Sequence, residues 1–252
     1  SPYIQNVCTV FMLLFGVNFN LYYLLLLGSF KAVLKDEELR AYLGIFAGAT
    51  LLIAWDVTSM MGSFGEALHH AAFTVSTIMS STGFATTDFD QWPGFSKSII
   101  LVLMLLGAMA GSTGGGMKTS RLVLMIKDLR CNIGRTLKPR SVKLVHMNGQ
   151  PVSDKVLQGV SAYMAAYWII IFASVLLISL NEVPLETSIS AVFSCFNNIG
   201  PGLQLVGPMC NYGHLSNLSK IVLSLDMLLG RLEIFPMLAL LSRSSWSRKR
   251  FH

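Results

Sequence analysis

Charged side chains are scarce in this sequence. Only 13% of its 252 residues are Asp, Glu, Lys or Arg, whereas 53% are hydrophobic, and the mean hydropathy is +0.58. A soluble domain carries roughly 25% charged residues, so this composition excludes an ordinary soluble domain and indicates that lipid surrounds much of the chain. In a bilayer, a chain of this length has room for about five or six spans of ~20 residues with their loops.

Cysteine is rare as well, and the pattern of catalytic residues is absent. The four cysteines show no CxxC spacing and no nearby His at metal-ligand spacing; they are Cys8, Cys131, Cys195 and Cys210. Buried or incidental thiols are therefore expected, rather than a disulfide or metal role. Because no nucleophile–base pair or metal cluster stands at a suggestive spacing, we expect no enzyme and no covalent cofactor.

The sequence also lacks an initiator Met and a signal peptide. It opens at Ser1 directly into apolar sequence, with no basic segment followed by a short apolar core and a cleavage site. We therefore interpret it as a piece of a longer polypeptide.

Long apolar stretches are what the sequence does have. Five reach the ~20 residues that a crossing helix needs, at 7–28, 41–61, 95–117, 160–180 and 217–241. Two further windows, 64–86 and 186–202, are apolar for a shorter distance and then break into Ser, Thr, Gly, Asn and Pro. Windows of that length are too short to span and are typical of re-entrant or interfacial segments.

Lys and Arg gather in the segments 29–40, 118–155 and 242–252, while the two short windows hold almost none. By the positive-inside rule the basic segments are cytoplasmic and both windows enter from outside, which five crossings satisfy. Orientation thus explains the net charge of +6, and nucleic-acid binding is not expected because no basic patch with interleaved aromatics occurs.

An internal repeat relates the two windows. Ser96-Lys97 is followed after six residues by 104–107 (Met-Leu-Leu-Gly), and Ser219-Lys220 is followed after six residues by 227–230 (Met-Leu-Leu-Gly). The repeating unit is a span, a short helix, a turn with glycine and a second span. Residues 1–28 then correspond to the last span of a preceding unit.

Each window joins a short helix to a glycine that permits backbone shapes other residues resist. Non-helical backbone at membrane depth survives only where protein buries it or where it lines a water-filled cavity. Such a turn can direct carbonyl oxygens and the negative end of the helix dipole at a dehydrated cation. A re-entrant plug or a tight interhelical turn would have the same pattern, and the occurrence of two equivalent windows favours a pore.

Five motifs carry a resemblance to a known family. They are Gly16-Val17-Asn18-Phe19-Asn20, Ser81-Thr82-Gly83-Phe84-Ala85-Thr86, Gly111-Ser112-Thr113-Gly114-Gly115-Gly116-Met117-Lys118, Asn198-Ile199-Gly200-Pro201-Gly202 and Gly230-Arg231-Leu232-Glu233. In this order and spacing the chain resembles the Trk/Ktr/HKT superfamily of potassium-translocating subunits, most closely its bacterial TrkH type.

The resemblance implies an all-α integral membrane protein built of K⁺-channel-like pore repeats in pseudo-fourfold arrangement, each with a re-entrant pore helix. It assigns the K⁺ selectivity filter to two of four loops, with residues Ser81, Thr82, Gly83, Phe84, Asn198, Ile199, Gly200 and Pro201. Backbone carbonyls of Thr82, Gly83, Ile199 and Gly200 would contact K⁺, the transported ion. Two filter loops lie outside this sequence, so the chain alone cannot close a pore.

The resemblance also assigns an intramembrane gating loop to Gly111, Ser112, Thr113, Gly114, Gly115, Gly116 and Lys118. The residue types support this assignment, because consecutive glycines make a poor helix and a good hinge. A phosphate-binding loop nearly fits, but Met117 spoils the GxxxxGK[ST] spacing and no strand precedes it. Arg231 is assigned to the pore lining, although an intramembrane Arg could instead pair with Glu233, Asp226 or the gating loop.

We divide the chain by these motifs into six segments: 1–28, the last span of a preceding repeat; 29–40, a cytoplasmic linker; 41–130, a third repeat with the gating loop; 131–155, a basic linker; 156–241, a fourth repeat; and 242–252, a basic tail. The expected function is half of a gated, K⁺-selective pathway in the bacterial inner membrane. The alternative is a secondary cation transporter with a broken-helix substrate site. The resemblance implies a homodimer and a cytosolic nucleotide-binding subunit, called TrkA in this type.

Overall fold

The computed structural model describes residues 1–138 and 144–241. Its helices are α1 (Pro2–Phe15), α2 (Phe19–Leu26), α3 (Phe30–Lys35), α4 (Glu37–Met61), α5 (Phe64–Met79), α6 (Gly94–Leu105), α7 (Thr119–Leu137), α8 (Asp154–Ser179), α9 (Leu185–Phe196), α10 (Asn217–Leu232) and α11 (Ile234–Leu241). Three short 3₁₀ turns and a two-stranded hairpin complete the described part: η1 (Phe89–Gln91), η2 (Gln204–Val206), η3 (Tyr212–His214), β1 (His146–Met147) and β2 (Gln150–Pro151). The expected basic tail and part of the expected basic linker lie outside the described residues.

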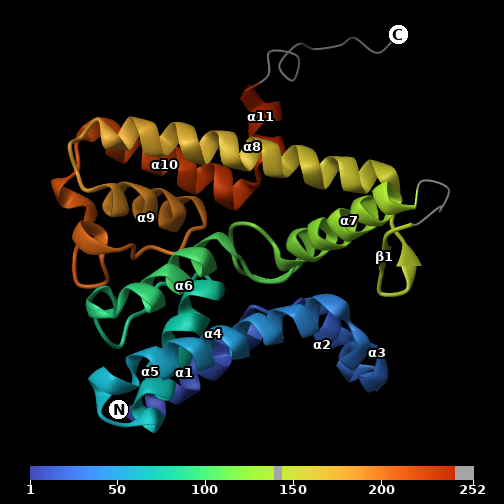
Figure 1. Cartoon of the computed structure of the whole chain (residues 1–252), viewed down its shortest axis with the longest axis horizontal. Coiled ribbons are helices and arrows are strands. Elements are labelled where there is room, and N and C mark those ends of the chain that lie inside the picture. The colour runs from blue at the N-terminus through green and yellow to red at the C-terminus, as the bar shows by residue number, and fades with distance from the viewer. Residues whose placement is uncertain (139–143, 242–252) are drawn as a thin grey trace.

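The helices form two groups (Figure 1). In the first, α4 packs against α5 and α6, and α1 packs against α5; in the second, α8, α9 and α10 pack on one another. Helix α6 contacts α9, and α7 leads from the first group past α4 and α8 to the hairpin. The short helices α5 and α9 therefore occupy corresponding places in the two groups.

Local signals explain where the first group's helices begin and end. Asp36 caps α4 by accepting a hydrogen bond from the Leu39 N–H, and Gly62, at φ +75°, ends it. Ser63 then caps α5 by accepting from the Glu66 N–H. This tight succession turns the chain from the long α4 directly into the short α5.

Two of the predicted spans are continuous helices. Within the described residues, α4 and α8 have the length and apolar composition to cross a bilayer, matching the predictions 41–61 and 160–180. Their outer faces expose large apolar side chains, among them Trp55 at 73% and Leu176 at 71%. Such faces need an apolar surrounding, which supports the prediction of a membrane protein.

The other three predicted spans are broken. The chain bends by 92° between α1 and α2, where Asn18 caps α2. Helix α6 ends at Leu105, before the glycine run, because backbone pairing with a later segment competes with the helix. The last stretch breaks at Glu233, which takes φ +64° between α10 and α11. Apolar composition alone did not reveal these interruptions.

Each group has its own hydrophobic core, and each core includes residues from segments that belong to the other group. The core of the first group includes Ile199 and Leu203, which follow α9 in the second group. The core of the second group includes Met117, which precedes α7. The segments after α5 and α9 and the glycine-rich segment thus lie where the two groups meet.

Candidate functional site

Helix α5 ends in a Schellman motif. The Thr82 N–H donates to the Thr77 carbonyl oxygen at 2.9 Å, and the Ser81 N–H donates to the Ile78 carbonyl oxygen at 3.1 Å. Ser81 occupies the left-handed position with φ +56°. This turn directs the chain out of the helix and into Gly83.

Helix α9 ends in the same motif although its sequence differs. The Ile199 N–H donates to the Ser194 carbonyl oxygen at 2.8 Å, and the Asn198 N–H donates to the Cys195 carbonyl oxygen at 3.1 Å. Asn198 has φ +57°, nearly the value of Ser81. The two turns place Gly83 and Gly200 at equivalent positions, and both glycines have positive φ, at +78° and +109°.

The two loops lie against each other at Gly83. A Cβ added there would collide with the Ile199 carbonyl oxygen and would stand 3.2 Å from Cδ of Pro201. Gly200 differs, because no described atom lies within 4 Å of the position its Cβ would take. Its carbonyl oxygen accepts a hydrogen bond of 2.7 Å from the Tyr212 hydroxyl. The structure therefore brings the predicted filter residues of the two windows together along one edge.

The glycine-rich segment is tightly packed. It runs from Leu106 to Lys118, and the Gly107 N–H donates to the Met117 carbonyl oxygen at 2.7 Å. At Gly115 a Cβ would stand 3.1 Å from the Asn197 carbonyl oxygen, and at Gly116, with φ +71°, it would collide with the Asn197 side chain. These glycines permit close approach to the end of α9, a requirement beyond the hinge that the sequence suggested.

Two cations donate to carbonyl oxygens of this segment. Arg231 Nη1 donates to the Thr113 carbonyl oxygen at 2.9 Å, and Lys118 Nζ donates to the Gly114 carbonyl oxygen. Among the described residues Glu233 pairs with Arg121 at 2.9 Å and forms no ion pair with Arg231, so of the alternative partners of Arg231 the structure shows the glycine-rich segment. A cavity of about 260 Å³ lies between the segment and the end of α10, bounded by Gly230, Arg231 and Glu233 on that side.

A sequence model of the TrkH family, described as a cation transport protein, matches residues 1–249. The chain belongs to the TrkH family. It is 30% identical over 250 residues to the Trk system potassium uptake protein TrkH of Salmonella typhimurium, covering 98% of this chain and 51% of that protein. A TrkH of Halomonas elongata is 32% identical over 252 residues, covering 98% of this chain and 52% of that protein.

A solved structure agrees with these sequence relatives. The chain superposes on the crystal structure of the potassium transporter TrkH from Vibrio parahaemolyticus with a TM-score of 0.86 and 31% identity, covering 98% of this chain and 53% of that one. This TrkH-family chain thus spans about half the length of the relatives it matches. The family and the apolar helices confirm the prediction of a multi-pass protein of the bacterial inner membrane.

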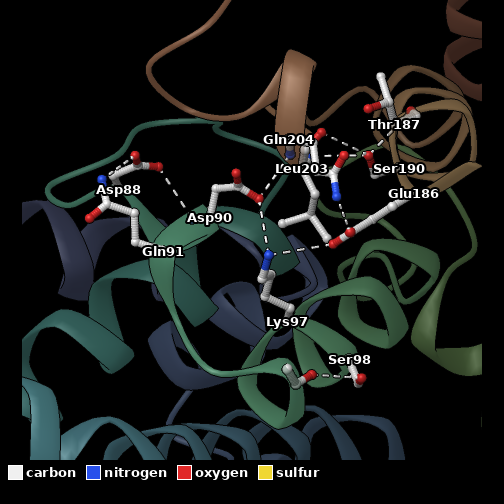
Figure 2. A network of polar contacts seen from close by, with 11 residues as sticks. Asp88, Asp90, Gln91, Lys97, Ser98, Glu186, Thr187, Ser190, Leu203 and Gln204 are labelled. Atoms are coloured by element: carbon white, nitrogen blue, oxygen red, sulfur yellow. Dashed lines mark hydrogen bonds and ion pairs between the residues drawn. The ribbon is translucent and has the colours of Figure 1, made fainter. Parts of the chain in front are cut away.

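Outside the loops at Gly83 and Gly200, a polar network joins the two groups of helices of this TrkH-family chain (Figure 2). Lys97 Nζ lies 3.5 Å from Asp90 Oδ1 and 3.6 Å from Glu186 Oε1. Asp90 also accepts a hydrogen bond of 2.8 Å from the Gln204 N–H. Gln204 follows Gly200 by four residues and has φ +54°. Asp88 instead bonds locally to Gln91 at 2.9 Å. Asp90 therefore links the segment after α5 to α6 and to the segment after α9, whereas Asp88, among the described residues, does not.

Asn197 is a site residue that sequence reasoning missed. The residue is only 1% exposed. Its Oδ1 accepts hydrogen bonds from the Tyr167 hydroxyl at 3.2 Å and from the Met117 N–H at 3.3 Å. Its Nδ2 donates to the Phe193 carbonyl oxygen at 2.9 Å. One side chain thus links α8, the end of α9 and the glycine-rich segment. The only signal in the sequence was an Asn at the end of a predicted helix, which is common at any helix end.

Proposed function

We propose that this chain forms half of a gated, potassium-selective pathway across the membrane. The observation that carries the proposal is the edge contact at Gly83, where two loops with the same Schellman turn bring equivalent backbone together. The matched relatives are named potassium uptake proteins, which supports K⁺ as the transported ion. Because the chain spans half of their length, the activity of the complete protein belongs to this proposal.

The two loops suit a dehydrated monovalent cation. In the proposed pathway the carbonyl oxygens of Thr82, Gly83, Ile199 and Gly200 replace part of the water shell of K⁺. Helices α5 and α9 end at these loops, so the negative ends of their dipoles favour a cation there. Two loops do not surround an ion, and we assign the remaining two to the half of the relatives that this chain does not match.

The glycine-rich segment is the proposed gate. It lies against Asn197 at the end of α9, and the positive side chains of Arg231 and Lys118 donate to its carbonyl oxygens. A packed segment with cations beside it opposes the passage of K⁺ both sterically and electrostatically. Opening then requires that these contacts break.

A secondary cation transporter with a broken-helix substrate site is not favoured. Such proteins are often built from inverted repeats, whereas the Lys and Arg distribution makes both short windows here enter from the same side of the membrane. The proposed assembly is a homodimer of the complete protein with a cytosolic nucleotide-binding subunit. The basic segments 118–155 and 242–252 are its candidate contacts.

Ion flux tests the filter assignment. In the protein that carries all four loops, reconstituted in liposomes, Gly83→Ser and Gly200→Ser should reduce the preference for K⁺ over Na⁺ by about tenfold, because each alters carbonyl placement. Gly200→Ser is the cleaner variant, since a Cβ at Gly200 has no described atom within 4 Å. An unchanged K⁺/Na⁺ ratio in both variants, with K⁺ flux retained, would contradict the assignment.

Deletion tests the gate. Removing 112–116 should raise K⁺ flux severalfold, because the segment no longer occupies the pathway. Insertion of five residues after Met209, which is 67% exposed between η2 and η3, is the control for a nonspecific change in chain length. Flux that stays at the wild-type level in the deletion variant would count against a gate.

A further inference from the structure

The glycine-rich segment is held at both ends by one buried carboxylate. Glu38 is the second residue of α4 and is 6% exposed. Its Oε1 accepts hydrogen bonds from the Ala110 N–H and from the Ser120 N–H, each at 2.8 Å. Ala110 precedes the glycine run and Ser120 follows Lys118 by two residues, so the two bonds bracket the whole proposed gate.

These bonds do not cap α4, the helix on which Glu38 stands, although the bond to Ser120 satisfies an N–H in the first turn of α7, where Lys118 gives no side-chain cap. A carboxylate in the first turn of a helix usually accepts from its own helix's N–H groups or simply faces the positive end of the dipole. Here Asp36 caps α4 through the Leu39 N–H, and Glu38 is left to bond residues 72 and 82 positions away. Because Asp36 already caps α4, the Glu38 carboxylate is available to bond the glycine-rich segment.

The burial of Glu38 makes the two bonds matter. Within 1–138 and 144–241, no ion pair is formed by Glu38, so the two backbone N–H groups are the partners that satisfy its Oε1. A buried carboxylate is costly without such partners, and buried amide groups are costly without an acceptor. Each side of the contact therefore stabilises the other in the closed arrangement.

The neighbours of Glu38 connect the same turn of α4 to the cytoplasmic elements. Glu37 pairs with Lys127 on α7 and accepts from the Asn148 N–H at 3.1 Å. Asp36 accepts from Asn148 Nδ2 at 2.7 Å. The first turn of α4 thus holds helix α7 and the hairpin through two residues and the proposed gate through the third.

We propose that Glu38 is a positioning residue that staples the glycine-rich segment closed, and that release of this staple frees the segment to move. The staple itself is a structural claim; its effect on K⁺ flux rests on the proposed function. Glu38 does not contact the ion, and its influence passes through the backbone at Ala110 and Ser120.

The test measures the staple directly and flux separately. In the reconstituted full-length protein, amide hydrogen exchange at Ala110 and Ser120 should become about tenfold faster in Glu38→Ala, because both N–H groups lose their acceptor. Glu38→Gln keeps an oxygen acceptor without the charge, and we expect a smaller increase of about threefold. K⁺ flux should rise in the same order.

Glu37→Gln is the matched control, since it removes the same charge from the adjacent residue without touching the segment. Its exchange at Ala110 and Ser120 should stay near the wild-type rate. Wild-type exchange in both Glu38 variants would overturn the staple, and Glu38→Gln decides the question if Glu38→Ala does not fold. Faster exchange in a protein whose wild type conducts no K⁺ would instead retain the staple and refute the proposed function.

Discussion

The two glycine loops share a backbone and differ in their surroundings. Both follow a Schellman turn with a non-glycine residue near φ +57°, yet one reads Ser-Thr-Gly-Phe and the other Asn-Ile-Gly-Pro. A Cβ at Gly83 would collide with the Ile199 carbonyl oxygen, whereas a Cβ at Gly200 would have no described atom within 4 Å. The backbone motif thus tolerates different side chains, and the neighbour of each loop decides how strictly its glycine is required.

The largest expected effect comes from adding a methyl group at Gly83. Gly83→Ala combines positive-φ strain with a collision at Ile199. We therefore expect the free energy of unfolding to fall by about 3 kcal/mol or more, and K⁺ selectivity to be lost. Gly200→Ala adds only the strain, about 1 kcal/mol. Thermal unfolding in detergent and flux in liposomes measure both. An equal loss in the two variants would show that a neighbour beyond the described residues also confines Gly200.

A second difference concerns Asn197 and Ser80, which precede the left-handed residue in the two loops. Asn197→Leu leaves the buried Met117 N–H without its acceptor, and we expect the free energy of unfolding to fall by about 1–3 kcal/mol. Among the described residues, the Ser80 hydroxyl bonds only to its own turn, to Thr82 Oγ1 at 2.7 Å and to the Thr77 carbonyl oxygen at 3.5 Å, so Ser80→Ala should lower the free energy of unfolding by about 0.5–1 kcal/mol. Chemical unfolding of the two variants checks the order, and a reversed order would refute the linking role of Asn197.

A third difference follows the repeated Met-Leu-Leu-Gly sequence. In the second copy of this sequence Gly230 is followed by Arg231, and in the first copy Gly107 is followed by Ala108. Arg231→Ala removes the hydrogen bond to the Thr113 carbonyl oxygen, and we expect K⁺ flux to rise about two- to fivefold. Arg231→Lys keeps the charge and serves as control. A fall in flux in Arg231→Ala would favour a direct role of the Arg charge in ion occupancy.

The smallest expected effect separates the repeated Ser-Lys pairs. Lys97 lies between Asp90 and Glu186, whereas Lys220 donates to the Gly213 carbonyl oxygen at 2.8 Å. Because Lys97 is about one-fifth exposed, Lys97→Met should cost only about 0.5–1 kcal/mol more than Lys220→Met. That difference should shrink in high salt, which screens ion pairs. A difference that persists unchanged in salt would exclude an electrostatic origin.

The sequence supported much of the helical architecture and the family resemblance, but it did not reveal the contacts within the site. The long helices α4 and α8 and the short helices α5 and α9 followed from the lengths of apolar stretches. The end of α6 at Leu105 did not, because the residues that follow are still apolar and the helix yields to pairing with Met117. Glu38 and Asn197 were missed since their partners lie far away in the sequence.

The filter and gate residues were named from motifs, and their roles remain predictions. What the structure adds is a reason for the glycines. At Gly83 and Gly116 there is positive φ and no room for a Cβ, whereas composition suggested flexibility alone. A sequence lists a glycine without showing whether turn, contact or hinge requires it.

The exchange of core residues between the two groups has a consequence for biosynthesis. During synthesis the first core lacks Ile199 and Leu203 until the ribosome has passed α9, and the second core receives Met117 from a segment made earlier. The first group of helices therefore enters the membrane with an incomplete core, which is completed only after the segment that follows α9 has been synthesised. Chaperones and proteases that act on nascent membrane proteins would encounter the first group of helices before its core is complete.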